Sequence, residues 1–515
     1  MRDIDRATTE LYNVSSLTLM ENAGTAVAKF VIGKFRKLRR VTVICGKGNN
    51  GGDGFVAARK FGDNGIRATV VLLADPAAVT GDAKVMLEKM QFQPIVVQSA
   101  EELESNAMTE ALKADVIIDA ILGTGFRPPV TGLYAGAIAL VNRSRKPVIA
   151  VDIPSGADAD AFTAEDSLRA RADHIVTFTA PRIAHAFAPL AKGETFVAPI
   201  GSPDEAIDSQ LDLHIITPRE FAPLISGRDV ESHKGTYGHA LVIGGSIGKA
   251  GAAAMAGISA LRSGAGLVTI ATPRSVLSTV AGFAPEIMTE SLSETDGGSI
   301  SPRSLTHEII GRILDGKDVV ALGPGIGRHP STVEFIHSFM IETDVPLIID
   351  ADGLNAFEGS ARKLLGSSRP LVLTPHPGEM SRLTGLSIRD IQADRVGVAR
   401  KFSTKHQCVL VLKGHRTLVA LPAGAVWVNV TGNAGMATGG SGDVLSGMIA
   451  GMMAQTRDVA SAVMAAVYLH GLAGDVAKEK MGEASLIAGD IIASLPEAFK
   501  RAKQSMAAKG FVFHA

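Results

Sequence analysis

The densest glycine cluster of the chain, GNAGMATGGSGDVLSGMIAG at 432–451, surrounds one acidic residue, Asp443. Six glycines fall between 432 and 447, and an apolar helix is expected to start near Gly442. Backbone N–H groups stacked at such a point form an anion hole for a phosphoryl group in transfer. Asp443 is placed to accept the proton of an attacking hydroxyl, as the catalytic base of a kinase does. This much glycine before an apolar helix disfavours a purely structural interpretation.

Other polar blocks follow the ends of expected strands in the same half of the chain. KGHRT (413–417) ends the run CVLVL and is a candidate for contacts with nucleotide phosphates. HPGE (376–379) follows LVLTP and offers the imidazole of His376 and a carboxylate, although His376 is equally explained as a turn residue before Pro377. GPGIG (323–327) is a further glycine-rich strand end.

Two aspartates in IIDADGLNA, Asp350 and Asp352, allow three interpretations: helix capping, a divalent metal site, or a substrate contact. Capping is the default, because Asp is among the preferred N-cap residues. The segment HKGTYGHALVIGGSIGKAGAA (233–253) adds one more glycine-rich strand end to this half.

A second glycine-rich block, GKGNNGGDG at 46–54, follows the strand-like run VTVIC in the first half of the chain. It is not a Walker A motif, because no G-K-[ST] follows its glycines. Asn49, Asn50 and Asp53 add amide and carboxylate oxygens, which are ligands for a hard cation. The alternative is a plain tight turn with Asn and Gly at positive φ.

Two more strand ends in the first half carry polar groups. DAILGTGFRPPVTG (119–132) places Asp119 inside an apolar run, and VDIPSG (151–156) places Asp152 and Ser155 at the end of another. Ligands of open α/β sheets bind at the carboxyl ends of strands, so these side chains are expected to converge. Asp152 is then a candidate general acid/base, with an N-cap or turn carboxylate as the alternative.

The elements that must position these residues are short Val/Ile-rich runs alternating with longer amphipathic segments. Continuous rather than alternating hydrophobicity predicts strands buried on both faces, hence a doubly wound, mostly parallel α/β sheet. Such runs fill two series separated by a polar, proline-containing stretch, where we place a linker near 205–225. The prediction is two tandem α/β domains, 1–212 and 222–508, with the tail 506–515 unassigned.

Composition excludes several classes of protein. The 515 residues are 46% hydrophobic and carry a net charge of −1, which excludes a mainly disordered chain and gives no field to attract nucleic acid or an anionic membrane. Cys45 and Cys408 lie in apolar runs and are expected to be buried thiols. The N-terminus is too polar for a signal peptide, and no apolar run reaches membrane-spanning length, so a cytoplasmic location is expected.

Four blocks in order, LMENAG (19–24), GKGNNGGDG, DAILGTGF and VDIPSG, resemble the N-terminal domain of the bifunctional NAD(P)H-hydrate repair enzymes over about residues 1–210. The resemblance implies a Rossmann-like epimerase that interconverts the R and S hydrates of NADH and NADPH, with Asp152 catalytic. It implies a potassium ion (K+) held by Asn50, Asp119 and Ser155. The implied substrate contacts are Asn49, Asn50, Gly51, Gly52, Asp53, Gly123, Thr124, Gly125, Phe126, Arg127, Pro128, Pro129 and Asp152.

Residues 225–505 are similar to the C-terminal half of the same family, a ribokinase-like, ADP-dependent NAD(P)H-hydrate dehydratase that uses Mg2+. HKG, HPGE and GSGDVLSG are close to the family pattern, whereas Arg416 of KGHRT stands where the family more often has a small residue. The implied hydrate contacts are Ala253, Gly325, His376 and Asp443, with Asp443 also catalytic. The implied nucleotide contacts are Lys413, Gly414, His415, Arg416, Thr417 and Gly442.

The chemistry fits these residue types. Hydroxide is a poor leaving group, so phosphorylating the ring hydroxyl of the hydrate, with Asp443 as base, makes phosphate the leaving group. Two alternatives remain at this point: an ordinary small-molecule kinase, and an N-terminal domain that is a non-catalytic binding module. Asn50, Asp119, Asp152 and Ser155 argue against the second. The expected partners are the hydrates and ADP, without nucleic acid or membrane, and the chain is expected to form a homo-oligomer.

Overall fold

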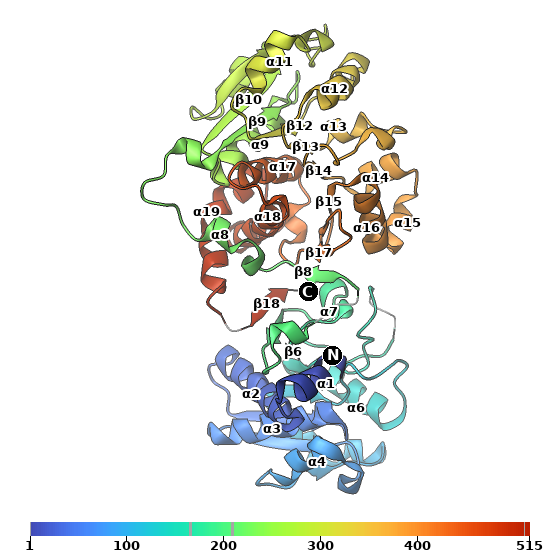
Figure 1. The fold of residues 1–515 in the computed structure, drawn as a ribbon. Coiled ribbons are helices and arrows are strands. Elements are labelled where there is room, and N and C mark those ends of the chain that lie inside the picture. Colours follow the sequence, from blue (N-terminus) through green and yellow to red (C-terminus); the bar gives the residue numbers. More distant parts are fainter. Residues whose placement is uncertain (1, 164–166, 208–210, 509, 515) are drawn as a thin grey trace. The chain divides into compact units, whose positions relative to one another are not determined.

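The computed structural model describes residues 2–163, 167–207, 211–508 and 510–514. The chain forms two compact units (Figure 1). The first comprises Met1–Ser209 together with Ala508–Ala515, and the second comprises Gln210–Ala507. Each unit is an α/β domain built around a largely parallel sheet, as the continuous Val/Ile runs predict.

The sheet of the first unit has the strand order β18-β7-β6-β5-β4-β1-β2-β3, and every pair is parallel except β18 with β7. Within this sheet, strands β1 to β6 have the order 3-2-1-4-5-6 of a Rossmann-type sheet. The strands stay parallel, but the order in which the chain adds them changes side between β1 and β4. The strands are β1 (Arg40–Cys45), β2 (Arg67–Leu72), β3 (Ile95–Val96), β4 (Val116–Ala120), β5 (Val148–Val151), β6 (His174–Phe178), β7 (Glu194–Ala198) and β18 (Phe511–His514).

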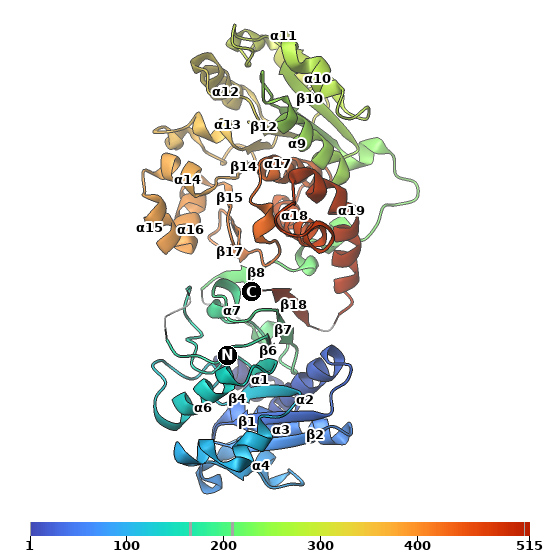
Figure 2. The same ribbon diagram turned by 180° about the vertical axis from the view of Figure 1, so that it is seen from behind.

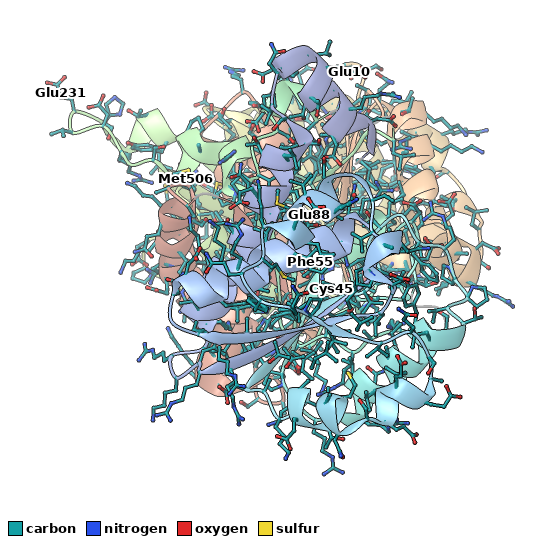
Figure 3. All side chains as sticks on the ribbon, turned by 90° about the horizontal axis from the view of Figure 1, so that it is seen from below. Glu10, Cys45, Phe55, Glu88, Glu231 and Met506 are labelled. Atoms are coloured by element: carbon teal, nitrogen blue, oxygen red, sulfur yellow. The ribbon has the colours of Figure 1, made fainter. Side chains whose placement is uncertain are left out.

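Helices cover both faces of this sheet, and successive residues of one strand point to opposite faces. Val43 and Cys45 of β1 pack with Phe55 against the α2 and α3 side, whereas Ile44 packs on the α5 and α6 side. Figure 3 shows Cys45 and Phe55 in the interior, and the Cys45 thiol is buried as expected. The helices are α1 (Arg2–Tyr12), α2 (Ser16–Lys34), α3 (Asn49–Asp63), α4 (Gly81–Glu88), α5 (Asn106–Ala111), α6 (Gly132–Arg143) and α7 (Ile183–Phe187).

The C-terminal tail, which the sequence left unassigned, completes the first sheet. Strand β18 pairs antiparallel with β7, with Phe511 opposite Val197 and Phe513 opposite Thr195. Phe513 is only 3% exposed. The last residues of the chain therefore belong to the core of the first unit and cover an edge of its sheet that would otherwise be open.

The sheet of the second unit has the order β11-β10-β9-β12-β13-β14-β15-β16-β17-β8 and is parallel from β11 to β15. Strand β8 lies within the segment expected to be a linker, and pairs in parallel with β17. The strands are β8 (Leu213–Ile215), β9 (His239–Ile243), β10 (Leu267–Pro273), β11 (Met288–Leu292), β12 (Val319–Leu322), β13 (Leu347–Ile349), β14 (Leu371–Leu373), β15 (Val409–Leu412), β16 (Leu418–Ala420) and β17 (Val426–Val428).

Figures 1 and 2 show α9 and α17–α19 on one side of this sheet and α14–α16 on the other. Among the described residues, α18 alone has the length and apolarity of a membrane span, and 61% of its most apolar stretch is buried within the unit, as in a core helix. The helices are α8 (Ala222–Ile225), α9 (Ala250–Arg262), α10 (Leu277–Ala281), α11 (His307–Leu314), α12 (Pro330–Glu342), α13 (Asp352–Asn355), α14 (Pro377–Thr384), α15 (Ile388–Ala393), α16 (Arg395–His406), α17 (Ser441–Met453), α18 (Val459–Met481) and α19 (Ala488–Ser505).

Candidate functional sites

The first site lies at the carboxyl ends of β1, β4 and β5, where the sheet order reverses. These three strands are neighbours, β4 between β1 and β5, so the blocks that follow them meet at one edge. This is the usual position of a ligand in an open α/β sheet. The expected convergence of the three blocks is therefore present.

Asp119 and Ser155 form a buried, hydrogen-bonded pair in this site. The Ser155 hydroxyl donates to Asp119 Oδ1 at 2.5 Å, and the Ser155 amide donates to Oδ2 at 2.8 Å. Asp119 is fully buried, and burial raises its pKa to about 6 despite these hydrogen bonds, which act in the opposite direction. The Ser155 hydroxyl also accepts the Leu122 amide at 2.8 Å, which fixes the loop after β4 on the loop after β5.

Asp152 is held in a strained position beside them. Its φ is 65°, the left-handed region that a residue with a Cβ rarely adopts. Its carboxylate accepts the Thr124 amide on Oδ2 at 3.0 Å and the Thr177 hydroxyl on Oδ1 at 3.1 Å. Its carbonyl oxygen lies 2.8 Å from His185 Nε2. Asp152 caps no described helix, so its N-cap interpretation is wrong, and its carboxylate is oriented by neighbours that leave lone pairs for a substrate.

Asn50 and Asp152 converge on Gly123. A Cβ at Gly123 would lie 3.1 Å from Asn50 Oδ1 and 3.2 Å from Asp152 Oδ2, so a larger residue there would crowd both side chains. Asn50 is 9% exposed, and neither of its side-chain polar atoms has a hydrogen-bond partner among the described residues. A buried amide left unpaired is costly and calls for a missing partner.

The remaining predicted epimerase contacts surround this centre. Gly51 and Gly52 lie inside α3 rather than in a loop, because the helix already begins at Asn49. In the segment after β4, the amide of Phe126 donates to the Gly123 carbonyl at 3.0 Å, closing a turn that contains Thr124 and Gly125. Beyond it, Arg127 pairs with Asp160 at 2.6 Å, and Pro128 and Pro129 follow.

Two carboxylates near Asp152 complete the first site. Burial, followed by the charges of Asp152 and Asp5, raises the pKa of Asp53 well above its usual range. Burial and the charge of Asp152 likewise raise the pKa of Asp5, which lies on α1. Asp53 is predictable from the glycine-rich motif that contains it, whereas Asp5 is not, because no motif surrounds it and only the fold places α1 near the site.

The second site occupies the carboxyl ends of β9, β12, β13, β14 and β15, again around the reversal of strand order, here between β9 and β12. Asp443 lies in the first turn of α17, after Gly440, whose φ is 91°. Burial, then the negative charge of Asp350, raises the pKa of Asp443 to about 7, although Lys413 opposes the rise. A carboxyl group with this pKa changes protonation near neutral pH, as a general base requires.

A buried ion pair between Lys413 and Asp350 lies near Asp443. Lys413 Nζ donates to Asp350 Oδ1 at 2.8 Å and lies 3.8 Å from Glu379 Oε2. Asp350 also accepts the hydroxyls of Thr374 at 2.7 Å and Ser446 at 2.6 Å. Burial alone would raise the pKa of Asp350, but Lys413 and these donors hold it below its usual value. Asp350 caps no described helix, so the default interpretation of this residue is wrong.

Asp352 belongs to a separate cationic cluster rather than to a helix cap. It is the first residue of α13, and its carboxylate lies 2.9 Å from Lys249 Nζ and 3.6 Å from Arg328 Nε. Gly325 lies beside Lys249, since a Cβ there would approach the Lys249 carbonyl to 2.6 Å. Ala253, a residue of α9, is fully buried, so its contact with a hydrate stays a prediction.

His376 is the N-cap of α14, as its turn interpretation predicts. Its Nδ1 accepts the amides of Gly378 at 3.0 Å and Glu379 at 3.2 Å, while Nε2 lies 3.4 Å from Glu379 Oε1. Half of the side chain is exposed. Capping therefore uses one ring nitrogen and leaves the outer edge of the imidazole available to a ligand.

The residues of the KGHRT block have different locations: Lys413 lies in the site, whereas Arg416 is buried in the protein interior. Lys413 lies next to the helix terminus, because a Cβ at Gly442 would come within 3.4 Å of its Nζ. Gly414 has a φ of 140°, the Thr417 hydroxyl donates to the Gly414 carbonyl at 3.0 Å, and the His415 carbonyl accepts from Arg395. Arg416 is 6% exposed, and its guanidinium donates to the Val430 carbonyl at 3.0 Å. The residue that departs from the family pattern thus points into the protein.

Comparison with known proteins decides between the remaining interpretations. A family model described as NAD(P)H-hydrate dehydratase matches residues 240–497, and one described as YjeF-related protein N-terminus matches residues 16–184. The chain is 40% identical to the bifunctional NAD(P)H-hydrate repair enzyme Nnr of Moorella thermoacetica, with 98% of this chain and 96% of that protein aligned. This chain belongs to the family of bifunctional NAD(P)H-hydrate repair enzymes.

Two other relatives, named as the same bifunctional enzyme, support this membership. The enzyme of Thermofilum pendens is 37% identical over 97% of this chain and 95% of its own length, and that of Escherichia coli is 32% identical over 96% and 92%. A solved ADP/ATP-dependent NAD(P)H-hydrate dehydratase of Bacillus subtilis is 32% identical and covers 56% of this chain and 98% of its own, with a TM-score of 0.47. Because the similarity to these bifunctional enzymes extends over nearly the whole chain, it excludes a small-molecule kinase fused to a non-catalytic module.

Proposed function

We propose that the first site epimerises the R and S hydrates of NADH and NADPH, and that the second dehydrates the S hydrate to NAD(P)H while converting ADP to AMP and phosphate. The observation that carries the proposal is that one chain holds two separate acid/base centres. Asp152 and Asp443 each lie at the carboxyl edge of their own parallel sheet. Family membership supports the same two activities.

In the epimerase site, Asp152 moves the proton of the ring hydroxyl. As the hydroxyl loses this proton its C–O bond becomes a carbonyl, the C–N bond breaks, and the ring nitrogen keeps the bonding electron pair and takes up the proton from Asp152. Attack of the nitrogen on the other face of the carbonyl returns the proton to oxygen and restores the ring with inverted configuration. Thr124 and Thr177 hold the carboxylate in one orientation, so its remaining lone pairs face the substrate. Asp53 lies nearby, and burial together with the charge of Asp152 raises the pKa of its carboxyl group.

The residues of this site fit a potassium ion. The Asn50 side chain is buried without a partner, and Asp119 is a buried carboxylate. Oxygen donors with one formal charge suit a large, hard monovalent cation better than zinc, which favours His or Cys. Asn50, Asp119 and Ser155 would hold the ion. Its charge would stabilise negative charge developing on the substrate oxygen.

In the dehydratase site, Asp443 removes the proton of the S hydrate's hydroxyl, which then attacks the terminal phosphorus of ADP. The bond to the bridging oxygen breaks and AMP leaves. The ring nitrogen lone pair next expels phosphate from the ring carbon, and loss of a ring proton yields NAD(P)H. The N–H groups at the start of α17 and the Lys413 ammonium are placed to bind the phosphoryl oxygens.

A magnesium ion would supply charge neutralisation between the phosphates of the nucleotide. The Glu379 carboxylate, whose Oε2 lies 3.8 Å from Lys413 Nζ, would help to hold the ion, since carboxylate oxygens are ligands that Mg2+ prefers. We further propose a cytoplasmic, homo-oligomeric enzyme with ADP as the phosphoryl donor.

The experiment is incubation of purified S NADPH hydrate with the full-length protein, Mg2+ and ADP. The proposal requires NADPH, AMP and phosphate to form in equal amounts, as followed by absorbance and chromatography. NADPH formed without AMP, or AMP formed without NADPH, would contradict the coupled reaction. Replacing ADP by ATP in a parallel incubation identifies the preferred donor.

A further inference from the structure

The second unit contains a large hollow at the edge of the sheet opposite to its active site. The hollow measures about 530 Å³, within the usual size range of small-molecule sites. Tyr237 and Gly264, which line it, precede strands β9 and β10 in the chain. The hollow therefore lies at the amino ends of strands whose carboxyl ends form the dehydratase site, and neither proposed reaction uses it.

Its lining combines apolar walls with cationic groups. Leu224, Leu261 and Phe499 supply apolar surface from α8, α9 and α19, which lie side by side (Figures 1 and 2). Arg228 and Arg262 are exposed and form no ion pair with any described carboxylate. An unpaired guanidinium beside an apolar wall suits an amphipathic anion, whose charged and apolar parts find separate partners.

The cationic side is also preorganised. The Arg228 guanidinium stacks 3.8 Å from the centre of the Tyr237 ring and donates to the Gly264 carbonyl at 2.6 Å, which leaves several N–H groups for an anion. Ser263, which is 1% exposed, lines the hollow with a buried hydroxyl that has no hydrogen-bond partner among the described residues. Figure 3 shows Glu231 at the outer end of the adjoining loop.

Two helices connect the hollow with the active site. Helix α17 begins beside Asp443, and Gln455, which follows its end, lines the hollow; α9 begins after Lys249 and ends at the hollow. Their backbones touch, because a Cβ at Gly447 would lie 2.0 Å from the Ala256 carbonyl oxygen and one at Gly451 would lie 2.3 Å from that of Ala260. This close packing leaves little room for one helix to shift without the other, so the pair is a physical route by which the hollow and the active site could be coupled.

We propose that this hollow is an effector site for a small amphipathic organic anion, such as an aryl or acyl carboxylate, sulfonate or phosphate, and that its occupancy alters nucleotide binding at the dehydratase site. The guanidinium groups of Arg228 and Arg262 bind the anion, and the apolar wall binds the organic group. The coupling runs through the α9–α17 pair, whose other end carries Asp443.

The test uses 8-anilinonaphthalene-1-sulfonate, a fluorescent aryl sulfonate, titrated into the full-length protein with saturating ADP and NADPH to occupy the nucleotide sites. We expect one saturable site that Arg228→Glu and Arg262→Glu each weaken at least tenfold. The matched control is Arg389→Glu, an exposed arginine on α15 outside the hollow, which should leave binding unchanged. All three positions are exposed, and unchanged melting temperatures would show that the variants fold.

Coupling is measured by repeating the titration without ADP. We expect the dissociation constant of the probe to change at least fivefold, and that of ADP to change by the same factor when the probe is present, because binding linkage is reciprocal. Probe binding that ignores both hollow variants, or that ADP simply abolishes, would overturn the site. A changed sedimentation coefficient of Arg228→Glu without loss of probe binding would show an interface between copies instead, and equal affinities with and without ADP would overturn the coupling.

Discussion

Asp443 is expected to destabilise the unliganded protein, because its position serves catalysis rather than folding. A carboxyl group whose pKa rises from 3.8 when unfolded to about 7 when folded binds its proton more tightly in the native state. The folded protein therefore loses stability as pH rises from about 4 through 7, and the full loss is at most about 4 kcal/mol at ~1.4 kcal/mol for each unit of pKa. Asp443→Asn keeps the shape of the side chain and removes the charge, so it should relieve this loss.

The assay is thermal unfolding of the full chain without nucleotide, at several pH values from 4 to 8.5. At pH 8 the transition of the second unit should occur roughly 5 °C higher in Asp443→Asn than in the parent protein, and the difference should vanish near pH 4. Asp296→Asn is the control, because it removes the same charge from an exposed position in the second unit. A difference that does not depend on pH, or a less stable Asp443→Asn protein at pH 8, would refute the reasoning.

Three further outcomes are expected. The kcat/KM of dehydration should rise with pH through about 7, since Asp443 must be deprotonated to act as base, and a flat pH profile would exclude it as the titrating group. Phe513→Ala should lower the free energy of unfolding of the first unit by about 3 kcal/mol, because the side chain is buried. Epimerase activity should therefore be lost on heating before dehydratase activity, and simultaneous loss of both would argue against the placement of β18. Crystals soaked in rubidium should give an anomalous peak among Asn50, Asp119 and Ser155, and an empty position would discard the cation site.

Local sequence predicts most of the strands in both sheets. The runs VTVIC and CVLVL became β1 and β15 because a strand buried on both faces must be apolar throughout. Strands β8, β11 and β18 escaped prediction. All three lie at sheet edges, where strands are less uniformly apolar, and the sequence of β11, MTESL, carries no continuous apolar run. The pairing of β18 with β7 joins residues more than 300 positions apart, which no local pattern specifies.

Some residues of the two sites are likewise predictable from local sequence, and others are not. Asp152 and Asp443 are predictable because strand-end carboxylates and glycine clusters are local features of the sequence. The role of Asp350 is not, because its partner Lys413 comes from another strand end 63 residues away. Asp5 is missed for a related reason: only the packing of α1 brings its carboxyl group near that of Asp152.

The proposed function requires two independent acid/base sites that act in sequence on one chain. Its most direct test is a mixture of R and S NADPH hydrates with ADP and Mg2+, followed epimer by epimer together with the NADPH absorbance. Asp152→Asn should convert the S hydrate and leave the R hydrate, with epimerisation slowed ~10²–10⁴-fold, whereas Asp443→Asn should still equilibrate the epimers without forming NADPH. An equal mixture of the two variant proteins should restore complete conversion. Failure of that mixture, or loss of epimerisation in folded Asp443→Asn protein, would contradict the claim.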